Sequence, residues 1–350
     1  MQTPRAEQVR EGAVARTPEV DAAALEKLLY AAVAAPSIHN TQPWRFGLDA
    51  ETRSVHVRAD RERRLRLTDP HARAQHLSVG AAVFNLRVAA AHLGWDPVVE
   101  LLPERGDPEL LATVRLCPRT PDAEPSYAEP SYACLYDAVG RRHTSRMPFT
   151  GRPVPDHVVA EMVAAARTEG AHLDMPDIAG TRRLLRLTAL AEARNTAHPG
   201  RRAEARGWVT APRTSARYGI PVTSLGPLDP DGRMPMRDFT GPLPGLRLPA
   251  LRFERHAQVA LLWTTQDRRA DWLRAGQALE RALLVATRHG VRTSMLHQAM
   301  EWPDLREAMT GQRRRCFPHL LIRFGYGPEG GRTPRATAFP TPPDAPRPAA

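Results

Sequence analysis

Two long apolar stretches, residues 77–93 and 273–289, repeat one pattern within this 350-residue chain. Each has the apolar periodicity of a buried helix, and each is followed by a glycine suited to a helix C-terminus, Gly94 or Gly290. The two glycines lie 196 residues apart. A duplicated unit predicts two copies of one fold packed about a pseudo-two-fold axis. The alternative is a chance likeness between two helices rich in alanine and leucine.

Other features keep the same separation. Gly80 and Gly276 are also 196 residues apart, and both fit helix packing better than ligand binding. A helical pattern at residues 20–35 precedes the first long helix, and another at 154–167 precedes the second. The proposed duplication therefore extends beyond the two long helices.

Strand patterns lie around these helices. We predict strands at residues 44–48, 55–59, 113–116, 259–264 and 320–324, and further helices at 135–140 and 181–194. The fold class is then α+β, with two similar halves that each contain a mixed or antiparallel sheet surrounded by helices.

The chain divides at segments rich in proline and poor in periodicity. We expect a flexible arm at 1–17, a first half at 18–118, a linker at 119–134, a second half at 135–328 and a Pro-rich disordered tail at 329–350. The linker contains a tandem Ala-Glu-Pro-Ser-Tyr repeat. Within the second half, a region at about 200–250 reads as a lid-like insertion.

Bulk composition argues against several classes of protein. The net charge is +11, but basic runs such as residues 61–66 lack interleaved aromatic residues, so nucleic-acid binding is not indicated. A positive surface would still attract phosphorylated ligands. Three cysteines without Cys-x-x-Cys spacing predict neither a disulfide framework nor a metal site. The polar N-terminus and the lack of an apolar run of about 18 residues predict a cytoplasmic protein without a membrane span.

The most unusual local segment is residues 34–46, Ala-Ala-Pro-Ser-Ile-His-Asn-Thr-Gln-Pro-Trp-Arg-Phe, between a helix pattern and a strand pattern. Ser37, Asn40 and Gln42 offer hydroxyl and amide groups on a backbone stiffened by two prolines, which suits a fixed polar ligand. An ordinary helix-to-strand turn is the alternative, because Pro, Ser and Asn favour turns.

A basic cluster opens the second half. Arg142, Thr144 and Arg146 alternate along the chain, and alternate residues of an extended segment share one side. Two guanidiniums and a hydroxyl on one side can bind a phosphate. A solvated basic stretch is the alternative. The first half lacks this cluster and the second lacks the Pro-Ser segment, so each half retains one part of a composite site.

The motif Pro-Ser-x-x-Asn-x-Gln-Pro-Trp-x-Phe resembles the flavin-facing loop of the nitroreductase family, and the rest of the chain resembles the tandem-repeat, Acg-like branch of that family. The resemblance implies a nitroreductase-like fold duplicated in one chain as a pseudo-dimer. It also implies one FMN between the halves, with a second site lost. A monomer or a weak homo-oligomer is then expected, because the usual dimer interface is internal.

The resemblance further implies which residues bind FMN. It assigns the phosphate to Arg142 and Arg323 and the pyrimidine edge of the flavin to Arg146. For Arg323 a surface salt bridge is the alternative, since a charge within an apolar strand needs a partner. The family places a backbone turn over the flavin near residues 294–298. The full expected set is Pro36, Ser37, Ile38, Asn40, Gln42, Arg142, His143, Thr144, Arg146, Met295, Gln298 and Arg323.

Two functions fit these features. The first is an FMN-dependent oxidoreductase that uses NAD(P)H to reduce a nitroaromatic or quinone-type acceptor by hydride transfer through flavin N5. No catalytic side chain is required, and His297 is expected at the surface. The second is a flavin-binding or sequestering protein in which residues 208–239 form a lid that blocks turnover. A third, a nucleic-acid or partner-binding module driven by charge, has no motif to support it.

Overall fold

The computed structural model describes residues 20–119, 132–210, 217–239, 248–311, 313 and 315–337. The expected arm at 1–17, most of the linker and the tail from residue 338 lie outside the described residues. The first half contains α1 (Ala22–Val33), β1 (Trp44–Asp49), β2 (Ser54–Ala59), α2 (Arg73–His92), β3 (Trp95–Leu101) and β4 (Leu110–Pro118). The second contains α3 (Tyr136–Arg141), α4 (Asp156–Thr168), β5 (His172–Asp174), α5 (Ile178–Ala197), α6 (Pro199–Gly207), β6 (Val209–Thr210), β7 (Ile220–Pro221), β8 (Gln258–Thr264), α7 (Arg269–Arg288), β9 (Arg292–Leu296), α8 (Pro303–Thr310) and β10 (Phe317–Gly325).

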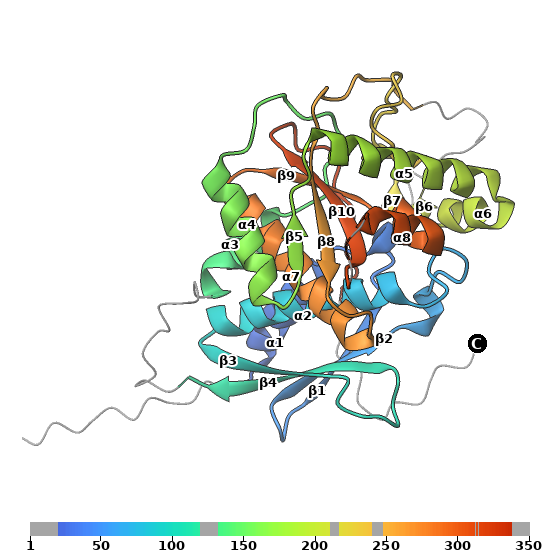
Figure 1. The fold of residues 1–350 in the computed structure, drawn as a ribbon. Helices are drawn as coiled ribbons and strands as arrows, with labels where there is room; N and C mark the ends of the chain where they lie inside the picture. The colour runs from blue at the N-terminus through green and yellow to red at the C-terminus, as the bar shows by residue number, and fades with distance from the viewer. Residues whose placement is uncertain are drawn as a thin grey trace, which may run out of the picture.

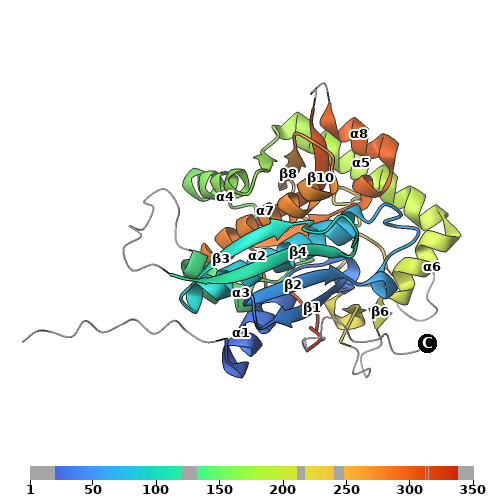
Figure 2. The same cartoon turned by 90° about the horizontal axis from the view of Figure 1, so that it is seen from below.

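The two large sheets share one topology. The first has the strand order β1-β2-β4-β3, which Figure 2 shows from below, and the second has the order β5-β8-β10-β9. All neighbouring strands within both sheets are antiparallel. Matched in chain order, the four strands of each sheet occupy the same positions, and α2 and α7 each follow the second strand. The α+β fold duplicated in one chain is therefore confirmed.

One difference separates the halves. In the first half, a short turn joins β1 to β2; in the second, a long insertion at residues 175–257 separates β5 from β8. The insertion is wider than the expected 200–250, because it begins with α5. Helices α5 and α8 cover one face of the second sheet through a cluster that includes Leu184, Met309 and Leu321. Figure 1 shows both helices in the upper part of the molecule, beside β10.

The long helices α2 and α7 cross at the two predicted packing glycines. A Cβ added at Gly80 would lie 2.1 Å from the carbonyl oxygen of Leu273, and one added at Gly276 would lie 2.1 Å from that of Leu77. Leu77 and Leu273 are themselves 196 residues apart, so the contact is reciprocal. This is the pattern of an interface around a two-fold axis. Each helix ends before a glycine with positive φ, as predicted, with φ of 88° and 69°.

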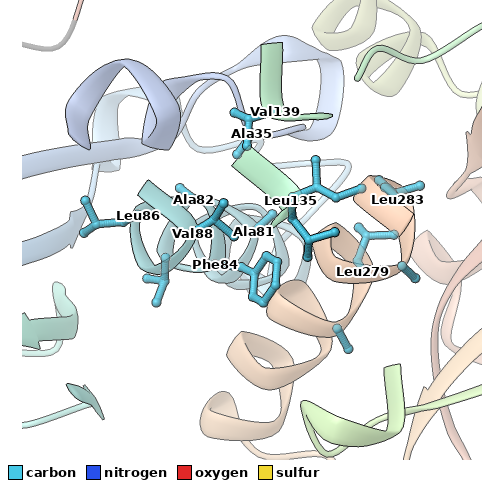
Figure 3. Packing of buried hydrophobic residues seen from close by; sticks show 14 of the residues in the cluster. Ala35, Ala81, Ala82, Phe84, Leu86, Val88, Leu135, Val139, Leu279 and Leu283 are labelled. Atoms are coloured by element: carbon cyan, nitrogen blue, oxygen red, sulfur yellow. The ribbon is translucent and has the colours of Figure 1, made fainter. Parts of the chain in front are cut away.

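The main core lies between the halves and joins them. Figure 3 shows Phe84 of α2 and Leu279 and Leu283 of α7 packed near Leu135 and Val139, which begin the second half. All five side chains are buried. Burying each such side chain contributes roughly 1.5–3 kcal/mol to folding. Because these five residues come from both halves, a half on its own would lose this contribution.

The strands and helices that the sequence did not reveal have weak periodic signals. Strand β3 contains Pro97 and lies at a sheet edge, where proline is tolerated because no ladder bond is lost on the open side. Strand β9 is also an edge strand, and it replaces part of the turn expected at 294–298. Helix α6 has Ala205 as its one buried residue, and α8 is short, with Leu305 and Met309 as its buried residues. The tail expected at 329–350 also differs, because residues 328–337 form a defined segment without regular secondary structure, called here the C-terminal segment.

Candidate active site

The Pro-Ser loop (residues 34–43) has an unusual backbone. After α1 it forms a 3-10 turn at Ile38–Asn40, and His39, Asn40 and Gln42 all have left-handed backbone angles, with φ of 51°, 55° and 48°. The Ser37 hydroxyl accepts a hydrogen bond from the Gln42 amide at 2.9 Å and fixes the turn. Three such residues within four positions cost conformational energy, which is typical of segments shaped for a ligand.

The basic cluster after α3 is extended, as predicted. Thr144 forms a bridge with Thr293, and the Ser145 amide donates to the Thr293 carbonyl at 2.9 Å, so the cluster lies along β9. This pairing turns Thr144 and Arg146 toward one cavity, while Ser145 is buried.

That cavity, the candidate cavity, lies between the halves. Its wall combines the Pro-Ser loop and α2 from the first half with the basic cluster, β9, the insertion and the C-terminal segment from the second. Nine of the expected residues line it: Pro36, Ser37, Ile38, Asn40, His143, Thr144, Arg146, Met295 and Gln298. The structure therefore brings together segments that are more than 250 residues apart in the chain.

Arg146 supplies one of the positive charges on this wall. Its guanidinium donates to the Ser224 carbonyl at 3.2 Å, and no carboxylate of the described residues forms an ion pair with it. Burial lowers the pKa of Arg146 to about 10, so the side chain remains positive at neutral pH. A cation that is largely removed from water and has no counter-ion is costly. An anionic ligand in the candidate cavity would remove that cost.

His39 adds a neutral polar group. Burial, followed by the nearby charge of Arg237, lowers the pKa of His39 well below its usual value, so the ring is uncharged at neutral pH. Its Nε2 is buried without a hydrogen-bond partner among the described residues, and the ring meets Phe239 edge-on at 5.1 Å. An unsatisfied buried nitrogen on a cavity wall is a further sign that a ligand completes the site.

Three expected residues do not line the candidate cavity, and the expectation for them is corrected. Arg323 is fully buried in β10, where its two nitrogens bond Glu254 at 2.5 and 2.6 Å. Because two guanidinium nitrogens of Arg323 already donate to the Glu254 carboxylate, Arg323 is not available to a phosphate. Arg142 is buried 3.3 Å from Glu280 of α7 and donates to the Ala34 carbonyl at 2.9 Å.

Gln42 is the third. Its side-chain amide donates to the Arg217 carbonyl at 2.7 Å and its oxygen accepts from the Ala336 amide at 2.9 Å. Gln42 therefore holds the insertion and the C-terminal segment against the Pro-Ser loop instead of facing the cavity.

Asn40 has the same structural role although it lines the cavity. Its amide nitrogen donates to the carbonyls of Gly219 and Pro334 at 2.8 and 3.0 Å, and its oxygen accepts from Arg335 at 2.9 Å. Gln298 likewise donates to the Pro235 carbonyl at 2.9 Å. These amides fasten two covering segments over the cavity.

Arg335 was missed by sequence reasoning. It reaches the cavity from the C-terminal segment, donates to Asn40 and to the Thr333 hydroxyl at 2.7 Å, and keeps a buried Nε without a partner. Burial, followed by the charge of Arg142, lowers its pKa to about 9. The only sequence signal was a basic residue within a Pro-rich tail, and that composition favoured disorder.

His297 also differs from expectation, because it lines the cavity instead of the surface. Its Nδ1 lies 3.3 Å from Glu301, whose carboxylate also contacts Arg237 and accepts from Asn195 at 2.8 Å. Burial raises the pKa of Glu301, but the charge of Arg237 and the bond from His297 outweigh it and bring the value to about 2. Glu301 is therefore ionised and fixes His297 in place.

The pKa of Glu280 is raised, whereas that of Glu301 is lowered. Burial raises the pKa of Glu280 to about 7 against an ordinary 4.5, so the folded protein binds a proton that the unfolded chain releases between these values. The free energy of unfolding should therefore fall as pH rises from about 5 to about 7.5. In Glu280→Gln that fall should be smaller, as urea unfolding at both pH values would measure. Identical pH slopes in the two proteins would contradict it.

The pseudo-symmetric counterpart of the candidate cavity lacks a polar loop like the Pro-Ser loop. Ala270 and Arg274, which stand 196 residues after two residues of the candidate cavity, line a surface pocket with Glu169. Glu169 is bonded to Arg87 at 2.5 Å and to Arg281 at 2.7 Å. The Glu169 carboxylate thus neutralises the positive charges of Arg87 and Arg281.

Other kinds of site have little support. None of the described helices has the length and apolar composition needed to cross a membrane. In the described parts of the chain, no three His, Cys, Asp or Glu side chains are grouped so as to hold a metal ion.

Comparison with known proteins identifies the family. No protein-family model matches the chain. Two Mycobacterium tuberculosis proteins, named "Putative NAD(P)H nitroreductase Rv3131" and "Putative NAD(P)H nitroreductase acg", are 33% and 32% identical to it, over 88% and 87% of this chain and 86% and 89% of their own lengths. A nitroreductase with bound FMN from Bacteroides fragilis aligns with 59% of this chain and 94% of its own, at 13% identity and a TM-score of 0.35. On the two mycobacterial matches, the chain belongs to the nitroreductase family.

Proposed function

We propose that the candidate cavity binds one FMN per chain and that the protein is an NAD(P)H-dependent oxidoreductase acting on nitroaromatic or quinone-type acceptors. The observation that carries this proposal is Arg146, a half-buried arginine without a carboxylate partner among the described residues, facing a cavity walled by the strained Pro-Ser loop. The names of the two mycobacterial relatives support NAD(P)H as the reductant.

The residues on the cavity wall fit such a ligand. Arg335 and Thr144 supply a cation and a hydroxyl suited to the phosphate, a role first expected of Arg142 and Arg323. Arg146 suits the pyrimidine edge, where a cation stabilises the anionic reduced ring. Pro36 and Ile38 give the Pro-Ser loop apolar surface for the flat ring. Bound FMN would supply hydride transfer at N5 between the nicotinamide and the acceptor.

A second function, flavin sequestration without turnover, is favoured by one specific observation. Asn40, Gln42 and Gln298 tie the insertion and the C-terminal segment over the candidate cavity through five hydrogen bonds of 2.7–3.0 Å. Met236 and Phe239 of the insertion add apolar cover. This cover would limit the access of a nicotinamide to a ring in the cavity.

An anaerobic NADPH titration of the FMN-loaded protein separates the two functions. For the oxidoreductase, absorbance near 450 nm bleaches with NADPH and returns when a quinone or nitroaromatic is added. For a sequestering protein, the bound FMN stays oxidised with excess NAD(P)H but bleaches with dithionite. A purified protein that neither contains nor takes up FMN rules out both.

A further inference from the structure

A second cleft, larger than the candidate cavity, lies on the far side of the insertion. Its volume is about 820 Å³, within the range of small-molecule sites. It is formed where the first half of α5 approaches the start of α4, residues 232–234 and the chain entering β8. Figure 1 shows α5 and the segment before β8 together in the upper part of the molecule.

The insertion separates the two cavities. Gly232 and Met234 line the cleft, whereas Met236 and Arg237, immediately beyond, line the candidate cavity. Between them, the Pro235 carbonyl accepts the hydrogen bond from Gln298. The cleft is therefore a separate space that the proposed FMN site does not use.

The floor of the cleft is apolar and its rim is basic. The floor includes Val154, Met175, Leu185, Met234, Val259 and Phe324. Arg182 and Arg186 stand four residues apart on α5, so both lie on the helix face that borders the cleft. Neither forms an ion pair with any carboxylate in the described parts of the chain.

The acidic side chains of the cleft do not cancel this charge. Glu254 is bonded to Arg323, and its Oε2 also accepts from the Phe149 amide at 3.0 Å. Asp177 caps α5 by accepting from the Gly180 amide at 2.6 Å. Asp156, exposed at the start of α4, is the remaining carboxylate. The cleft thus combines two arginines without ion-pair partners, Arg182 and Arg186, with an apolar floor.

We propose that this cleft is a second ligand site, for a small amphipathic carboxylate. The alkyl or aromatic body would cover the apolar floor, and the carboxylate would accept hydrogen bonds from Arg182 and Arg186, whose forked donors match its geometry. The apolar floor, more extensive than the charged rim, favours a ligand with one anionic end over a nucleotide or a polyanion.

The test is isothermal titration calorimetry of the full chain with decanoate, below its micelle concentration and with FMN at saturation. We expect saturable binding at one site. Arg182→Gln/Arg186→Gln should weaken it by about tenfold or more, because two charge-assisted hydrogen bonds are lost. Ala189→Trp, which fills the cleft from α5, should abolish it.

The matched control is Arg105→Gln/Arg115→Gln, which removes the same charge from two exposed arginines of the first half and should leave decanoate affinity unchanged. Absence of saturable binding to the wild type, or equal affinity in the Arg182→Gln/Arg186→Gln and control proteins, would overturn the proposal. If FMN does not bind, the same titrations without it still decide the question, because the variants lie in the cleft and not in the candidate cavity.

Discussion

Arg146→Gln should weaken FMN binding by about 10- to 100-fold while leaving the fold intact. A hydrogen bond to a charged group contributes about 1.5–3 kcal/mol, which corresponds to this range of affinity. The fold should persist because the side chain is bound in the protein by one hydrogen bond, to Ser224 at 3.2 Å, and the substitution removes a half-buried charge that has no carboxylate partner among the described residues. Quenching of FMN fluorescence during titration measures the dissociation constant.

The same variant should also lower the midpoint potential of bound FMN, since a cation beside the pyrimidine edge stabilises the reduced anionic form. Arg115→Gln is the matched control, because Arg115 is exposed on β4 of the first sheet and its loss changes net charge equally. If Arg146→Gln and Arg115→Gln bind FMN alike, the candidate cavity is not the flavin site.

Local spacing predicted the backbone features that depend on neighbouring residues. The alternation of Arg142, Thr144 and Arg146 predicted an extended segment, and the structure places Thr144 and Arg146 on one cavity wall. The density of Pro, Ser and Asn at residues 36–43 predicted a shaped loop, and its left-handed angles agree. These features are set by backbone geometry within a few residues.

The errors came from partners distant in the chain. The resemblance assigned Arg323 to a phosphate, but Glu254, from an insertion without periodicity, supplies the partner that a charge in an apolar strand needs. Arg142 alternates with Thr144 as expected, yet it pairs with Glu280 on α7 and does not line the candidate cavity. Arg335 lies in a Pro-rich tail whose order depends on bonds to Asn40 and Gln42, which no local pattern encodes.

Gly276→Ala should lower the free energy of unfolding by about 3 kcal/mol or more, the largest stability effect we predict. The new Cβ would lie 2.1 Å from the Leu77 carbonyl oxygen and 2.9 Å from the Gly80 Cα, and backbone atoms cannot rotate away as a side chain can. The helices α2 and α7 must separate, which costs packing throughout the core they share. Urea unfolding followed by circular dichroism measures the loss.

Gly140→Ala is the control, since Gly140 is exposed near the end of α3 and its Cβ would meet nothing within 4 Å. There alanine should be neutral or stabilise by up to about 1 kcal/mol, because it favours helix over glycine. The pseudo-two-fold contact between Gly80 and Gly276 can be tested further by combining the two substitutions. Gly80→Ala displaces the same crossing by symmetry, so Gly80→Ala/Gly276→Ala should cost less than the sum of the single changes. Strict additivity would mean that the two glycines do not share one contact. It would contradict a pseudo-two-fold crossing of α2 and α7.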